Sequence, residues 1–167
     1  MHVDAEIQYD ATPAQVAAML ADEAFVEAKC VAMGALKQTV LVEGDHADAF
    51  TVTYSRTMPT DDFPDSARSF VGSTVTIRQV DEWQPPAADG SREGSVSVEI
   101  VGAPVRLSGS QSLRPAGAGT VQAVDGELKA SVPLLGGRLE KAAEPALRAA
   151  MRTEHRTGRE WLAREGA

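Results

Sequence analysis

Four polar residues lie on faces of expected strands that are otherwise apolar. In residues 49–58, Tyr54 and Arg56 continue a row of alternating side chains that begins with an aromatic residue. In the strands near residues 105–132, Gln111 and Gln122 share their faces with leucine and valine side chains. A buried polar group that lacks a partner costs about 1–3 kcal/mol. Each of the four is therefore expected to meet another side chain, a water molecule or a ligand.

The three histidines of the sequence are far apart. His2 is at the start and His46 lies in an expected hairpin turn, so neither forms a metal-ligand pair with a near neighbour. His155 follows Glu154 on an expected helix, where an acid or base role is conceivable and a surface or packing role is the simpler interpretation. We therefore assign no catalytic residue, no metal site and no cofactor from the sequence.

Other reactive groups also have simple structural interpretations. Asp61, Asp62 and Asp65 fit helix capping and solvation better than a cation site. Cys30 is the single cysteine, so it cannot form an internal disulfide and is expected to be a small buried residue. Three arginines follow one another at four-residue spacing and could meet an acidic partner or a phosphate group, or could simply form a solvated helix face: Arg148, Arg152 and Arg156.

Composition narrows the class of protein. The chain has 167 residues, which fits one domain over 1–167, and its formal net charge of −8 disfavours binding to nucleic acid. Apolar runs fall short of the roughly 20 residues that span a bilayer, so we expect no membrane insertion. The first ten residues do not resemble a signal peptide, and we expect a cytoplasmic protein. The oligomeric state, monomer or dimer, stays open.

The expected elements form a simple order along the chain. Residues 2–10 alternate as a strand, Thr12, Pro13 and Gln15 form a helix-start signal, and two short helices follow up to Gly34. Six closely spaced strands cover residues 36–132, with a short helix near residues 61–72 and a bulge at Val80. Pro133 is expected to end the last strand, and Pro145 to kink the final helix or to delay its start.

The final helix determines the predicted architecture. An antiparallel sheet with one apolar face must cover that face, and the helix after Gly137 is the one long enough, at about 1.5 Å per residue, to do so. The inward residues of the sheet are mostly small, so space is expected to remain between sheet and helix. We therefore predict an α+β fold in which a curved antiparallel sheet wraps around a long C-terminal helix.

The order of elements resembles the helix-grip fold of the START-like (SRPBCC, Bet v 1-like) superfamily. The segments TPAQVAAMLAD and GGRLEKAAEPALRAAM are similar to its first helix entry and its closing helix. The segments FVGSTVTIRQVDEW, VPLLGGRLE and WLA more closely resemble an actinobacterial domain-of-unknown-function family, DUF2505. The resemblance implies a cavity between sheet and helix, and the superfamily includes lipid carriers, hormone receptors and polyketide cyclases.

We therefore expect a protein that binds a small hydrophobic or amphipathic ligand, such as a lipid, a polyketide or an aromatic metabolite, without catalysis. A cyclase or hydrolase that uses the same cavity, and an interaction module with a filled core, are the alternatives. The residues expected to line the ligand site are Phe50, Tyr54, Arg56, Phe63, Phe70, Ile77, Trp83, Val98, Gln111, Gln122, Leu147, Met151 and His155.

Overall fold

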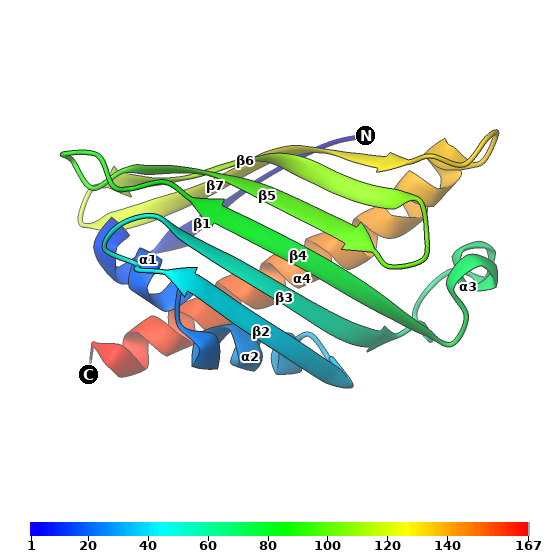
Figure 1. The fold of residues 1–167 in the computed structure, drawn as a ribbon, viewed down its shortest axis with the longest axis horizontal. Helices are drawn as coiled ribbons and strands as arrows, with labels where there is room; N and C mark the ends of the chain where they lie inside the picture. The colour runs from blue at the N-terminus through cyan, green and yellow to red at the C-terminus, as the bar shows by residue number, and fades with distance from the viewer. Residues whose placement is uncertain (167) are drawn as a thin grey trace.

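The computed structural model describes residues 1–166 and contains one antiparallel sheet and four helices. The sheet has the strand order β1-β7-β6-β5-β4-β3-β2, and the long helix α4 crosses one of its faces (Figure 1). This arrangement confirms the expected α+β helix-grip fold. The elements are β1 (His2–Tyr9), α1 (Pro13–Leu20), α2 (Glu23–Ala32), β2 (Lys37–Gly44), β3 (Phe50–Pro59), α3 (Asp65–Val71), β4 (Thr74–Trp83), β5 (Arg92–Ile100), β6 (Val105–Ala116), β7 (Gly119–Ala130) and α4 (Gly136–Glu165).

The two short helices after β1 begin at strong caps. The Thr12 hydroxyl accepts a hydrogen bond from the Gln15 amide, and the Gln15 side chain accepts one from the Thr12 amide, which confirms the expected capping box. The Asp22 carboxylate caps α2 in a similar way. Both helices pack beside the C-terminal half of α4, whereas α3 lies at the opposite end of the sheet (Figure 1). One end of the sheet is therefore covered by α1 and α2, and the opposite end lies beside α3.

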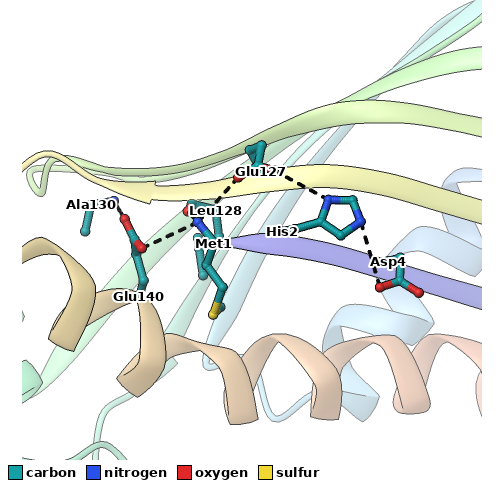
Figure 2. Close-up of polar contacts among 7 residues, drawn as sticks. All are labelled: Met1, His2, Asp4, Glu127, Leu128, Ala130 and Glu140. Carbon is teal, nitrogen blue, oxygen red and sulfur yellow. Dashed lines mark hydrogen bonds and ion pairs between the residues drawn. The ribbon is translucent and has the colours of Figure 1, made fainter.

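The start of α4 is tied to the end of β7. Glu140 accepts a hydrogen bond of 3.0 Å from the Ala130 amide, and its other carboxylate oxygen lies 3.5 Å from the Met1 ammonium (Figure 2). That ammonium donates to the Leu128 carbonyl at 2.7 Å. The Ala130 amide is the main reason that the pKa of Glu140 lies below its ordinary value. These contacts fix the position of the first turns of α4 relative to the sheet.

Two local expectations are wrong, and one of the two alternatives for Pro145 is excluded. The strand β7 ends at Ala130, three residues before Pro133, so this proline follows the strand and does not terminate it. The helix α4 begins at Gly136 and contains Pro145, so the proline does not delay its start. The register of β4 with β3 and β5 runs without interruption past Val80, so no bulge is present there.

The apolar core forms two clusters along α4. One joins α1, α2 and the adjacent ends of β1 and β3, and the other lies under the first half of α4 near Leu107 and Leu128. Buried Gly158 brings α4 against Tyr9 and Met19 in the first cluster. Residues of both clusters line the inner part of the candidate site. None of the helices in residues 1–166 is suited by length and apolarity to crossing a membrane.

Candidate functional site

A cavity in three adjoining parts follows α4 between the helix and the sheet. The inner hollow meets α4 from Leu147 to Glu154, the middle hollow from Ala143 to Ala150 and the outer hollow from Leu139 to Ala143. Their free volumes are about 70, 100 and 40 Å³. Because roughly 10–15 Å³ of such space holds the centre of one water molecule, the cavity suits a small ligand.

A buried ion pair lies at the inner end. Lys29 projects from α2, and its Nζ lies 3.3 Å from Oε2 of Glu154 on α4. Nζ also lies 4.7 Å from the centre of the Tyr54 ring, which adds a cation–π contact. Burial alone would lower the pKa of Lys29, but Glu154, Tyr54 and Asp81 outweigh it and raise that pKa. The ammonium is therefore charged in the folded protein.

Asp81 gives the inner hollow a second carboxylate. Burial raises the pKa of Asp81 to about 6, although Lys29 and two amide donors act in the opposite direction. The Nε2 atom of Gln79 lies 3.1 Å from both carboxylate oxygens, and that of Gln111 lies 3.3 Å from one of them. Asp81 is thus a carboxyl group that can gain or lose a proton close to neutral pH inside the cavity.

Two further polar side chains of the inner hollow have buried atoms without partners. Arg56 is 6% exposed and Gln122 is 4% exposed. Nη1 of Arg56 and Oε1 of Gln122 are both buried, and neither has a hydrogen-bond partner among residues 1–166. Arg56 lies where the inner and middle hollows adjoin, since it lines both of them. A buried polar group without a hydrogen-bond partner destabilises the folded protein unless a ligand or a water molecule at the site supplies that partner.

The middle and outer hollows are mainly apolar. Ile77, Val98 and Leu147 line the middle hollow, whose polar residues are Arg56 and the ion pair of Arg106 and Glu99 at 3.0 Å. Phe63 lines both hollows, and Phe70 of α3 lines the outer one, where its side chain is 46% exposed. The cavity therefore changes from apolar near α3 to polar near α2.

The structure places ten of the thirteen predicted residues on this cavity. Arg56, Trp83, Val98, Gln111, Gln122, Leu147 and Met151 line the inner hollow, and Ile77, Phe63 and Phe70 line the other two. Phe50 and Tyr54 are fully packed in the first core cluster and do not line it. His155 lies in grooves on the outside of α4, where its Nε2 is 3.1 Å from the Gln8 carbonyl and its ring meets Tyr9 edge-on.

Apart from Arg56, sequence reasoning missed the charged residues of the inner hollow, although the signal was present. Gln79 and Asp81 occupy the inward positions between Ile77 and Trp83 on β4, because successive side chains of a strand alternate between its faces. Lys29 lies in the apolar stripe of α2 that includes Val26 and Cys30. A polar residue on an apolar face identified the site residues on β3, β6 and β7. The same feature marks Lys29 on α2 and Asp81 on β4.

Two further groups of side chains bear on the chemistry of the surface and the site. In residues 1–166, no group of three or more histidine, cysteine or acidic side chains is arranged to hold a metal ion. Arg148 pairs with Glu144 at 3.0 Å, while Arg152, Arg156 and Arg159 line an open groove on the outer side of α4 together with acidic residues. The arginine row thus faces away from the cavity.

The sequence matches a known family. The family model described as "Protein of unknown function (DUF2505)" matches residues 4–162. No curated protein matches the sequence.

Solved structures share the fold at low sequence identity. A protein from Thermus thermophilus has a TM-score of 0.59 at 14% identity, covering 95% of this chain and 97% of its own. The Zhui aromatase/cyclase from Streptomyces sp. R1128 has a TM-score of 0.55 at 16% identity, covering 95% and 93%. A STAR-related lipid transfer protein from Xanthomonas axonopodis has a TM-score of 0.54 at 17% identity, covering 93% and 85%. With most of its length matched by the family model and its helix-grip architecture shared with these structures, the chain belongs to the DUF2505 family, which has a START-like fold.

Proposed function

We propose that this protein binds one small amphipathic molecule in the cavity under α4, with its apolar part in the middle and outer hollows. The observation that carries the proposal is the polarity gradient of the cavity. Apolar side chains such as Val98 and Leu147 surround the wider part, and buried donors and acceptors lie at the inner end. Burial of apolar ligand surface supplies affinity at about 25 cal/mol per Å² before the costs of association.

The inner polar groups fit a ligand better than they fit core packing. Core side chains pack closely, and their polar atoms normally have partners. Here Arg56 and Gln122 retain unpartnered buried atoms beside open space. A ligand with polar atoms at one end supplies hydrogen-bond partners for these buried atoms, and a wholly apolar ligand leaves them without partners. Two structures that share the fold are named for lipid transfer and for aromatase/cyclase activity, and these names are consistent with an amphipathic ligand.

Titration with the neutral fluorescent probe N-phenyl-1-naphthylamine tests the proposal. Ala150 lines the inner and middle hollows, so Ala150→Phe fills the cavity, whereas Ala149 is exposed and Ala149→Phe serves as the matched control. We expect saturable binding to the wild type and to Ala149→Phe, and affinity at least tenfold weaker in Ala150→Phe. Equal binding by all three proteins, or no saturable binding by the wild type, would refute the proposal. Circular dichroism checks that each variant is folded.

Asp81 favours a second candidate function, an enzyme of the cyclase or hydrolase type. A carboxyl group with a pKa of about 6, held by Gln79 and Gln111 inside a cavity, is suited to act as a general acid or base near neutral pH. Hydrolysis of p-nitrophenyl decanoate is a direct assay for the hydrolase form of this function. Turnover that disappears in Asp81→Asn, while the neutral probe still binds, would favour the enzyme; turnover equal to the buffer rate would count against it.

A further inference from the structure

The two buried arginines of the fold differ in how their charge is satisfied. Arg92, 3% exposed, donates from Nη1 to the carbonyls of Asp48 at 2.8 Å and Gln84 at 3.4 Å, and from Nη2 to the carbonyl of His46. Arg56, 6% exposed, makes no ion pair and no side-chain hydrogen bond within the described chain. Its guanidinium carbon lies 5.8 Å from the centre of the Tyr54 ring, and its unpartnered Nη1 is buried where the two hollows adjoin.

The other three charged side chains of the inner hollow already have polar partners within the protein. Lys29 pairs with Glu154 at 3.3 Å, and the Asp81 carboxylate accepts from two glutamine amides. Among the four charged side chains that line this hollow, Arg56 and Asp81 form no ion pair in residues 1–166, and Arg56 is the one with a buried side-chain nitrogen that has no hydrogen-bond partner. A buried charge requires a partner because removing it from water costs several kcal/mol. The free space beside it is where such a partner would lie.

We infer that Arg56 binds the acid group of the ligand, so that the cavity takes a monoanionic amphiphile, a carboxylic acid with an apolar body, in preference to a neutral lipid or alcohol. This inference rests on the proposed function and specifies its ligand class. The acid oxygens accept hydrogen bonds from the guanidinium, which are charge-assisted and therefore strong. The apolar body extends from Arg56 into the middle hollow, toward Ile77 and Val98.

The length of the cavity is consistent with a medium-sized acid. The middle and inner hollows together follow α4 from Ala143 to Glu154, and at about 1.5 Å per residue this stretch is on the order of 16 Å long. Both an aliphatic acid and an aromatic acid satisfy the requirement for an anion at Arg56. The experiment therefore includes one matched pair of each kind.

Competition against N-phenyl-1-naphthylamine at pH 7.5 compares decanoate with 1-decanol, and 2-naphthoate with 2-naphthylmethanol. We expect the wild type to bind the acid of at least one pair at least tenfold more tightly than its alcohol. Arg56→Met removes the charge but keeps an apolar side chain, and it should abolish this preference while the alcohol binds as before. Arg56→Lys should retain part of it. Arg78→Met is the matched control, because Arg78 is exposed and ion-paired on the adjacent strand and its loss changes the net charge equally.

The outcomes separate this inference from the proposal on which it rests. If the neutral probe binds but acids and alcohols compete equally, or if the acid preference survives in Arg56→Met, the assignment of Arg56 is overturned and the cavity proposal stands. If probe, acids and alcohols all fail to bind, both are overturned. A preference confined to decanoate or to 2-naphthoate supports the inference and decides between an aliphatic and an aromatic body.

Discussion

Lys29 on α2 and Glu154 on α4 form an ion pair of 3.3 Å that joins the two helices inside the protein, beside the cavity. The Lys29 side chain is 3% exposed and that of Glu154 is 15% exposed. Such a pair is not a strong source of stability by itself, because desolvation offsets most of the attraction, but each charge depends on the other. The pair therefore fixes the inner end of the cavity and makes this region sensitive to single substitutions.

Lys29→Met should destabilise the protein strongly, because it leaves the Glu154 carboxylate buried without its partner. We expect a loss of about 3–5 kcal/mol in the free energy of unfolding, measured by urea denaturation at pH 7.5. The double variant Lys29→Met/Glu154→Met should recover most of that loss, since it removes both charges. If the free energy of unfolding of Lys29→Met lies within about 1 kcal/mol of the wild-type value, the two charges do not depend on each other as proposed.

Asp81→Asn should stabilise the protein at neutral pH. The pKa of Asp81 is about 6 in the folded protein, against 3.8 as its ordinary value, so the folded state binds more protons than the unfolded chain between these two pH values. Stability conferred by this group therefore falls as pH rises from about 4 to about 6, and it stays low above pH 6. The shift corresponds to about 2–3 kcal/mol at 1.36 kcal/mol per pKa unit.

Urea denaturation at several pH values measures this effect. The difference in unfolding free energy between Asp81→Asn and the wild type should be near zero at pH 4 and should favour the variant at pH 7.5. The asparagine side chain of the variant would retain one oxygen as an acceptor for Gln79 or Gln111. A difference that is constant with pH would show that Asp81 does not carry the raised pKa.

Gly158→Ala tests the contact between α4 and the first core cluster. An added Cβ would lie 2.8 Å from Cε1 of Tyr9 and 3.2 Å from Cε of Met19, so neighbouring side chains would have to move. We expect a loss of about 1–3 kcal/mol despite the better helix propensity of alanine. Gly137→Ala, on the same helix with open space around the added carbon in the described structure, should instead be neutral or stabilising. Equal effects of the two substitutions in thermal denaturation would contradict this account of the packing.

Arg92→Met and Arg56→Met should have opposite consequences for stability. The first substitution leaves carbonyl groups of Asp48, Gln84 and His46 without their donor, and we expect a loss of about 2–4 kcal/mol. The second removes a buried charge that forms no ion pair in residues 1–166 and has an unpartnered Nη1, so the unliganded protein should keep its stability or gain some. Urea denaturation of both variants without ligand makes the comparison. A larger loss for Arg56→Met than for Arg92→Met would show that Arg56 has a structural role.

The sequence was sufficient to predict the architecture because its local signals agree with one another. The Thr12 capping box, the alternation of the strands and the length of the last helix each predict the element that forms. The cavity was predictable in outline for the same reason, and most of the predicted lining residues come from strand faces. The resemblance to a START-like family added the expectation of a cavity to this pattern.

The charged end of the cavity depends on tertiary contacts that sequence spacing does not specify. Lys29 and Glu154 are 125 positions apart in the chain and meet because α2 packs against α4. Tyr54 was expected in the cavity because it shares a strand face with Val52 and Arg56, yet its ring is packed against Lys29 in the core. His155 was expected at the site as a histidine beside Glu154 on the last helix, yet the structure places it in grooves outside the cavity.

Methyl-labelled NMR spectra of the wild type during titration with N-phenyl-1-naphthylamine test the central claim most directly, because they locate the ligand. We predict chemical-shift changes and intermolecular contacts at the methyl groups of Val98, Leu107 and Leu147, which line the cavity, with Val31 and Leu41, which are exposed elsewhere, unaffected. Shift changes confined to exposed methyl groups, or no changes at the cavity methyl groups under saturating probe, would contradict binding beneath α4.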